Sequence, residues 1–355
     1  MPLWSLATPL VAAALLGLSL VLPVGLALGS LSALALVGAV IAAVHHAEVI
    51  AHRVGEPFGT LVLALAVTVI EVALIVSMML AGGPDKATLP RDTIFATLMI
   101  ICNGVVGLCL VVGSLRHREQ AFRVEGANAG LATLIAMATL TLVLPTFTIS
   151  SPGPTYTISQ LAFAATMSLV LWAVFVFVQT IRHRDYFLPV GDIADADAHA
   201  APPSAGVAWA SGALLLLALV AVVGLAKVLS PGIEAALAAA GAPKPVLGIA
   251  IAMLVLLPET VAAVRAARRN RLQTSLNLAY GSALASIGLT IPAVAVASVW
   301  LQLPLVLGAD SKDLVLLMLT VVVSSITLSS GRTHVMQGAV HVVIFAAFLF
   351  LALVP

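Results

Sequence analysis

Two glutamates stand alone in long apolar stretches of the sequence. Glu71 lies in LAVTVIEVAL, residues 65–74, and Glu259 lies in MLVLLPETVA, residues 253–262. An isolated carboxylate among aliphatic side chains is costly to bury, and such groups usually mark ion pathways or proton relays. The alternative for each is a protonated glutamate that donates a hydrogen bond to a neighbouring helix. Because the feature occurs twice, we favour cation and proton binding for both.

The residues near the glutamates offer further oxygen atoms. Pro258 has no N–H, so the carbonyl of Leu254 loses its usual helical donor and becomes available to a cation. The next apolar stretch after Glu71, ICNGVVG, contains Asn103, whose amide oxygen also suits a cation. The stretch after Glu259, NLAYGSALASIGLTIP, contains Ser282 and Ser286. Small residues also permit close helix packing, and for Ser282 both interpretations stay open.

The elements that must position these residues are membrane-spanning helices. The chain has 355 residues, of which 61% are hydrophobic and only 9% are charged. This composition lies far outside that of soluble domains and indicates an all-α polytopic membrane protein. A span needs about 20 mostly apolar residues. Eleven segments meet this condition: 7–28, 31–51, 58–81, 93–113, 126–147, 157–182, 208–229, 245–266, 276–300, 312–329 and 335–353.

The basic residues orient these spans. Cytoplasmic loops are enriched in Lys and Arg. With a cytoplasmic N-terminus, the inner loops hold Arg53, Arg116, Arg118, Arg123, Arg182, Arg184, Arg265, Arg268, Arg269, Arg271 and Arg332. The outer side then holds only Lys86, Arg91, Lys227, Lys244 and Lys312. We therefore predict a bacterial inner-membrane protein with a cytoplasmic N-terminus and a periplasmic C-terminus.

The glutamates suggest an internal repeat. Glu71 falls in the third span and Glu259 in the eighth, and an offset of five spans reverses the direction of the helix. This predicts two inverted five-helix repeats, residues 31–182 and 208–355, after an extra N-terminal helix in residues 1–30. Inverted repeats place a binding site near the bilayer midplane, on interrupted helices at the repeat interface. Glu71 and Glu259 are therefore expected to form one site.

Residues 183–207 form an acidic linker between the repeats, on the predicted cytoplasmic side. It carries Asp192, Asp195 and Asp197 together with a Pro-Pro pair. A Ca²⁺-sensing role is one interpretation of these carboxylates. We favour a solvated linker, because the segment is too polar to bury.

Histidines provide weaker candidates. His45, His46, Glu48 and His52 lie near the inner end of the second span, where a zinc site is conceivable. We favour a polar helix end at the membrane interface, because no further ligands cluster there. His341, in the last span, could relay protons or hydrogen-bond within the bundle.

Three stretches resemble a known family: EPFGTLVLALAVTVIEVALI, ETVAAVRAARRNRLQTSLNLAYGSALASIGLTIP and SGRTHVMQG. They are similar to cation/proton antiporters of the calcium:cation antiporter superfamily, closest to the bacterial ChaA-like members. The resemblance implies that Glu71 and Glu259 are the paired acidic residues of the two repeats. It likewise matches Asn103 to the asparagine of an SN pair, and Gly281 and Ser282 to a GS pair.

The chain departs from the calcium/proton exchangers of that superfamily near both glutamates. Those proteins read like GNATE and GNAAE, whereas this chain has VTVIE and VLLPE. Thr68 and Leu256 stand where asparagines are expected, and Ala285 stands where a glutamine is expected. Ca²⁺ takes 6–8 oxygen ligands, so the loss of oxygen atoms makes Na⁺ or K⁺ more plausible.

Together these features predict an antiporter that exports Ca²⁺, Na⁺ or K⁺ in exchange for H⁺, both ions competing for the two glutamates. The alternatives are a passive cation channel and an intramembrane metalloenzyme, although no H-E-x-x-H motif is present. No P-loop occurs, so we expect neither a nucleotide nor another cofactor. The expected partners are membrane lipid, the cation and H⁺. Nucleic acid is not expected, and a homo-oligomer stays open.

Overall fold

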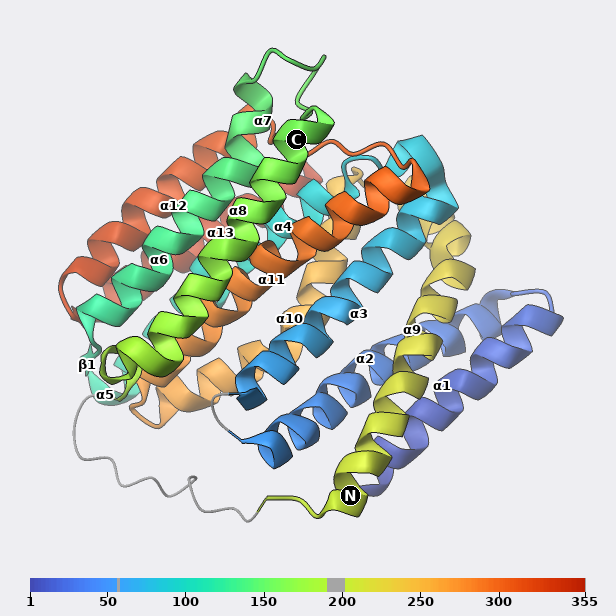
Figure 1. The fold of residues 1–355 in the computed structure, drawn as a ribbon, viewed down its shortest axis with the longest axis horizontal. Helices are drawn as coiled ribbons and strands as arrows, with labels where there is room; N and C mark the ends of the chain where they lie inside the picture. The colour runs from blue at the N-terminus through green and yellow to red at the C-terminus, as the bar shows by residue number, and fades with distance from the viewer. Residues whose placement is uncertain (56–57, 190–201, 355) are drawn as a thin grey trace. The chain divides into compact units, whose positions relative to one another are not determined.

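The structure, a computed structural model, describes residues 1–55, 58–189 and 202–354 and is almost entirely helical in that part of the chain (Figure 1). Eleven of its helices are long and apolar enough to cross a membrane, which confirms the predicted number of spans. The first three are α1 (Leu3–Val21), α2 (Leu26–Val54) and α3 (Phe58–Gly82), followed by the short 3-10 helix η1 (Gly83–Lys86). Asp192, Asp195 and Asp197 of the predicted linker lie outside the described residues.

Three of the next spans contain π-helical turns. The fourth span comprises α4 (Leu89–Met99), η2 (Ile100–Val105) and α5 (Val106–His117). The fifth comprises α6 (Val124–Ala138), η3 (Thr139–Val143) and α7 (Leu144–Phe147), and the sixth comprises α8 (Ile158–Phe177) and η4 (Val178–Arg182). The 3-10 helix η5 (Arg184–Phe187) follows. The remaining spans are α9 (Ala205–Ala239), α10 (Pro245–Arg268), α11 (Leu272–Leu301), α12 (Ser311–Ser329) and α13 (Val335–Leu353).

The predicted first span, 7–28, is wrong at its end. Helix α1 stops at Val21, and Leu22 has an extended backbone with ψ 149°. The cause is Pro23, because a proline disfavours helical geometry in the residue before it. Residues 26–28 belong instead to α2, which begins after Gly25.

The helices divide into two compact units that do not follow chain order. Unit 1 comprises Met1–Lys86 and Asp195–Ala242, and unit 2 comprises Ala87–Ala194 and Pro243–Pro355. In unit 1, α2 packs against α1, α3 and α9. The buried side chain of His46 joins three of these helices, with Nε2 2.8 Å from the Ser5 carbonyl oxygen and Nδ1 3.3 Å from Ser211 Oγ. These units group helices that pack together and do not test whether residues 31–182 and 208–355 are repeats. The inverted repeat therefore stays a prediction.

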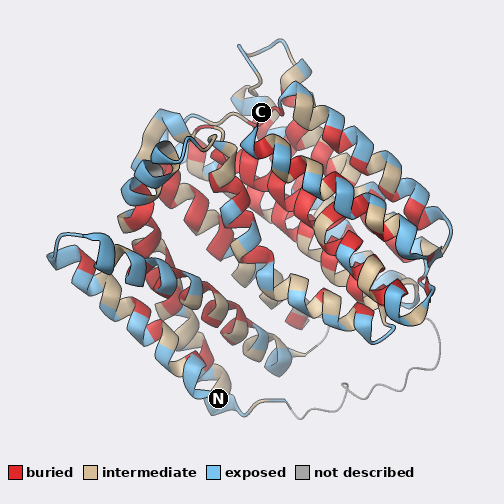
Figure 2. Ribbon diagram, turned by 180° about the vertical axis from the view of Figure 1, so that it is seen from behind, coloured by how far each residue is buried: buried red, intermediate tan, exposed pale blue. Residues whose placement is uncertain are grey.

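The centre of unit 2 is the fourth span. Every residue of α4 is buried, and the buried residues, red in Figure 2, line the interior of this unit. Helices α10, α11 and α12 pack against α4, and α13 packs against α5. The core therefore surrounds the segment that carries Asn103.

The connections of unit 2 gather at two ends. At one end, β1 (Gln120–Ala121) pairs antiparallel with β2 (Arg332–Thr333), and Gln120 Nε2 donates to the Ala267 carbonyl at 2.9 Å. At the other end, the amide N–H of Ala309 donates to the Leu142 carbonyl at 2.8 Å. Loops predicted to share one side of the membrane thus contact each other. Which side faces the cytoplasm stays a prediction.

Candidate cation-binding site

Glu71 lies on α3, inside unit 1. Its side chain is only 2% exposed, and Thr68, one turn earlier, is also buried. Residues three positions apart on a helix share a face, so both oxygen-bearing side chains lie on the same side of α3. The rest of α3 is dominated by aliphatic side chains. Glu71 is thus a buried carboxylate on a mainly aliphatic helix.

Glu259 lies on α10, inside unit 2, where it is half-buried. Helix α10 continues through Pro258, so the expectation of an interrupted helix is wrong at this glutamate. The proline still supplies no N–H, which leaves the Leu254 carbonyl without the donor that residue 258 would otherwise provide. A proline can persist inside a spanning helix because neighbouring helices and polar side chains satisfy the freed group.

Ser282 and Ser286 lie one turn apart on α11, which packs against α10. Ser286 is buried and Ser282 is half-buried. Their four-residue spacing puts both hydroxyls on one face of the helix. This face and the Glu259 helix belong to the same unit.

Asn103 lies in the π-helical turn η2 and is completely buried. A π-turn inserts an extra residue into an α-helix and is frequently found at functional sites. The fourth span, which contains this turn, packs against α10 through α4, η2 and α5. The composition of ICNGVVG gives no signal for this turn.

The Asn103 amide joins a polar cluster that the sequence analysis did not assemble. Asn103 Nδ2 donates to Thr320 Oγ1 at 2.9 Å, and Asn103 Oδ1 lies 3.1 Å from His341 Nδ1. His341 Nε2 in turn lies 3.1 Å from Thr327 Oγ1. A signal was present, because Thr320, Ser324 and Thr327 fall on one face of α12 at helical spacing.

Glycines bring the helices of this cluster together. A Cβ on Gly107 would lie 2.8 Å from the Cβ of His341, and a Cβ on Gly104 would lie 3.3 Å from the ring of Phe345. Real Cβ contacts are essentially never below 3.0 Å, so α13 could not approach α5 this closely past a larger residue. The packing role predicted for the small residues of this span is thus present at Gly104 and Gly107.

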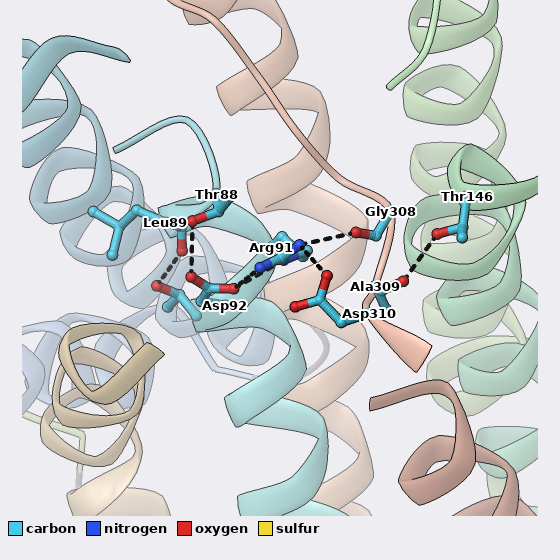
Figure 3. Close-up of polar contacts among 9 residues, drawn as sticks. Thr88, Leu89, Arg91, Asp92, Thr146, Gly308, Ala309 and Asp310 are labelled. Carbon is cyan, nitrogen blue, oxygen red and sulfur yellow. Dashed lines mark hydrogen bonds and ion pairs between the residues drawn. The ribbon is translucent and has the colours of Figure 1, made fainter. Parts of the chain in front are cut away.

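A second polar network, at the end of unit 2 where Ala309 bonds to Leu142, centres on Arg91 (Figure 3). Arg91 Nε donates to Asp92 Oδ1 at 2.9 Å, while Nη1 donates to the Gly308 carbonyl at 3.1 Å and to Asp310 Oδ1 at 3.2 Å. Thr88 Oγ1 donates to the other Asp92 oxygen at 3.0 Å. Sequence reasoning treated Arg91 only as a loop charge and missed this network.

The histidines near the end of α2 have different surroundings. His46 is buried and turned toward Ser5 and Ser211, whereas Glu48 and His52 are exposed. In residues 1–55, 58–189 and 202–354, no three His, Cys, Asp or Glu side chains are grouped so that they could hold a metal ion. The polar helix end stays a prediction for Glu48 and His52, whereas His46 packs between helices.

The structure brings Asn103, Thr320 and His341 into direct contact and places the Glu259 helix against η2 within the same unit. Glu71 and Thr68 belong to the other unit. The approach of the Glu71 and Glu259 carboxylates therefore stays a prediction.

Comparisons with known proteins cover nearly the whole chain. The family described as sodium/calcium exchanger protein matches residues 10–181 and 210–354. The chain is 50% identical to a putative ionic transporter, y4hA, of Sinorhizobium fredii, over 100% of this chain and 97% of the relative. It is 33% identical to the sodium-potassium/proton antiporter ChaA of Escherichia coli, over 94% of this chain and 90% of ChaA. The fold resembles the crystal structure of the Ca²⁺/H⁺ antiporter protein YfkE, with a TM-score of 0.73, 15% identity and 99% of each chain covered.

Proposed function

Because the chain belongs to the sodium/calcium exchanger protein family, we propose that it exports Na⁺, K⁺ or Ca²⁺ in exchange for H⁺ through Glu71 and Glu259. Membership of this family makes the chain a cation antiporter, and hence a transporter and not an enzyme; such proteins move cations without a bound cofactor. The observation that carries the finer proposal is Glu71, a carboxylate 2% exposed in the middle of an aliphatic span. Glu259 lies five spans later, in the eighth candidate span, and we take it as the counterpart of Glu71.

Exchange follows from competition for these carboxylates. An ionised glutamate attracts a cation, whereas a protonated glutamate is neutral and releases it. Protons arriving from one side therefore displace the cation, and cations arriving from the other side displace the protons. This opposition couples two flows without nucleotide hydrolysis. Asn103 and Ser282 supply neutral oxygen ligands, and Thr68, Ser286 and the Leu254 carbonyl are secondary ligands.

Helix pairings support the two inverted repeats. If spans 2–6 correspond to spans 7–11, the contact between spans 4 and 11 maps onto one between spans 9 and 6. Unit 2 contains both contacts, since α5 packs against α13 and α11 packs against α8. In unit 1, the corresponding spans 2 and 7, α2 and α9, pack against each other. Repeats related in this way place their site near the bilayer midplane.

The ligand set favours Na⁺ or K⁺ over Ca²⁺. Thr68, Leu256 and Ala285 replace amide side chains that the resemblance leads one to expect, and Ca²⁺ requires 6–8 oxygens. ChaA, 33% identical, is a sodium-potassium/proton antiporter. The basic residues at the β1–β2 end of unit 2, among them Arg116, Arg268 and Arg332, support a cytoplasmic location for that end in a bacterial inner membrane.

The test is cation-driven proton movement in everted vesicles that contain the protein. Na⁺, K⁺ and Ca²⁺ are added separately to vesicles with an imposed pH gradient, and the internal pH is followed by a fluorescent dye. The proposal expects each transported cation to dissipate the gradient, with Na⁺ or K⁺ effective at lower concentrations than Ca²⁺. A passive channel instead gives cation flux that an opposing pH gradient does not drive. That result would contradict antiport and favour a passive channel.

A further inference from the structure

Four buried polar side chains in unit 2 are joined by hydrogen bonds, and the proposed exchange uses only one of them. Thr320 and Thr327 come from α12, Asn103 comes from η2, and His341 comes from α13. None of the four side chains is more than 3% exposed. Buried polar groups that are fully hydrogen-bonded fix the arrangement of the helices that carry them.

The chemistry of the partners fixes which group donates in each of the three hydrogen bonds that join these four side chains. The hydroxyl of Thr320 has two neighbours that can only accept, the Leu316 carbonyl at 2.8 Å and Met99 Sδ at 3.5 Å. Its oxygen must therefore accept from Asn103, which assigns the amide nitrogen to the Thr320 side and the amide oxygen to the His341 side. Met99 Sδ, also an acceptor, lies 3.8 Å from the same nitrogen and agrees with this assignment.

The orientation of Asn103 then determines the tautomer of His341. An amide oxygen only accepts, so the hydrogen between Asn103 Oδ1 and His341 Nδ1 belongs to the imidazole. In the neutral ring Nε2 is then an acceptor, and Thr327 Oγ1 donates to it across 3.1 Å. Each hydrogen bond is thus donated in the same direction: from Thr327 to His341, from His341 to Asn103, and from Asn103 to Thr320.

Close packing fixes the position of the imidazole as well as its tautomer. Gly107 lets the Cβ of His341 come within 2.8 Å of the point where its own Cβ would be. Gly338, one turn before His341, packs equally closely, because a Cβ on it would lie 2.7 Å from the Val111 backbone nitrogen. Helix α13 therefore holds the ring firmly against the helix that carries Asn103.

We propose that His341 is a positioning residue of cation exchange, which holds the Asn103 amide so that its oxygen faces the cation with one lone pair free. The amide oxygen has two lone pairs, of which His341 Nδ1–H takes one. This inference rests on the proposed function, because it takes Asn103 as a cation ligand. His341 itself does not touch the cation.

Two substitutions of His341 separate positioning from packing. In His341→Asn, the amide nitrogen replaces Nδ1 and still donates to Asn103. In His341→Gln, the amide lies where Nε2 was and keeps the contact with Thr327 only. His341→Asn is expected to keep the half-saturating cation concentration within about twofold of wild type. His341→Gln is expected to raise it roughly tenfold, which corresponds to about 1.4 kcal/mol of binding free energy.

A second pair tests the opposite side of the amide and does not alter His341. Thr320→Ser keeps the hydroxyl that accepts from Asn103 and is expected to behave like wild type. Thr320→Val has nearly the same shape but no acceptor, and is expected to raise the half-saturating concentration as His341→Gln does. Thermal unfolding of each purified variant in detergent separates lost stability from lost affinity.

The proposal is overturned if His341→Asn and His341→Gln raise the half-saturating concentration equally, or if neither changes it in folded protein. It is also overturned if both Thr320 variants match wild type. Failure of the proposed function has a different signature, because Glu259→Gln would then retain proton-coupled exchange.

Discussion

Replacing Arg91 by methionine removes a guanidinium that joins two segments of unit 2, helix α4 and the connection between α11 and α12. Arg91 contacts two carboxylates of very different exposure: the side chain of Asp92 is 4% exposed, whereas that of Asp310 is 59% exposed. In Arg91→Met, Asp92 keeps only the hydrogen bond from Thr88. Breaking a buried ion pair by removing one partner costs about 3–5 kcal/mol. Because Thr88 still satisfies one oxygen, we expect a loss of about 3 kcal/mol.

The matched control is Asp310→Asn, which removes the exposed carboxylate from the same Arg91 nitrogen. Exposed ion pairs contribute about 0–1 kcal/mol, so this variant is expected to unfold at nearly the wild-type temperature. The double variant Arg91→Met with Asp92→Leu leaves no unpaired charge. Replacing both members of a buried pair by apolar residues is often neutral, so the double variant should recover most of the lost stability.

Thermal unfolding of the detergent-solubilised protein measures all three variants. The expected order of unfolding temperatures is Asp310→Asn and wild type highest, the double variant next, and Arg91→Met lowest. Equal destabilisation by Asp310→Asn and Arg91→Met would refute the reasoning, because exposure would then not govern the strength of the two contacts. A double variant less stable than Arg91→Met alone would contradict it independently.

Three further predictions follow from packing and exposure. Gly107→Val should destabilise the protein by about 1–3 kcal/mol, because its side chain would overlap the Cβ of His341; Gly17→Val, where nothing lies within 4 Å, should not, and thermal unfolding compares them. Cys102 and Cys109, 3% and 1% exposed, should resist a water-soluble maleimide until the protein is denatured, and rapid labelling of the native protein would contradict their burial. Replacing Asp192, Asp195 and Asp197 together by asparagine should leave the maximal exchange rate nearly unchanged if the linker is only solvated. A shift in the Ca²⁺ dependence of exchange would instead indicate regulation.

Hydropathy predicted the helical class and the number of spans. Eleven apolar segments of sufficient length predict eleven spans, because a helix that crosses lipid must be apolar along about 20 residues. The end of the first span was misplaced because Pro23 and Gly25 sit among apolar residues and break the helix without lowering its hydropathy. At this position the backbone preferences of proline and glycine, and not the hydropathy of the segment, determine where the helix ends.

The candidate site was only partly predictable. Glu71 and Asn103 are polar groups in apolar spans, and their burial follows from the sequence alone. The π-turn that carries Asn103 depends on how the fourth span packs, since a single extra residue per turn leaves no periodic signal. The partnership of Asn103 with His341 joins residues in the fourth and last spans, and only the packing of α13 on α5 and η2 reveals it.

The central claim is that Glu71 and Glu259 exchange protons for cations. Glutamine keeps the shape of each side chain but cannot take up or release a proton, and a neutral amide is less costly to bury than a charge. Glu71→Asp and Glu259→Asp keep the carboxylate but withdraw it by one methylene, so weakened exchange is expected. Glu125→Gln, at an exposed position on α6, is the matched control.

The decisive measurement is cation-driven proton movement in vesicles that carry equal amounts of wild-type protein, Glu71→Gln, Glu259→Gln or Glu125→Gln. The account predicts that both buried-span variants lose proton-coupled cation flux while remaining folded and inserted, and that Glu125→Gln exchanges normally. Near-normal exchange by well-inserted Glu71→Gln or Glu259→Gln would contradict the account, because the unchanged flux would show that the carboxylate carries neither the proton nor the cation.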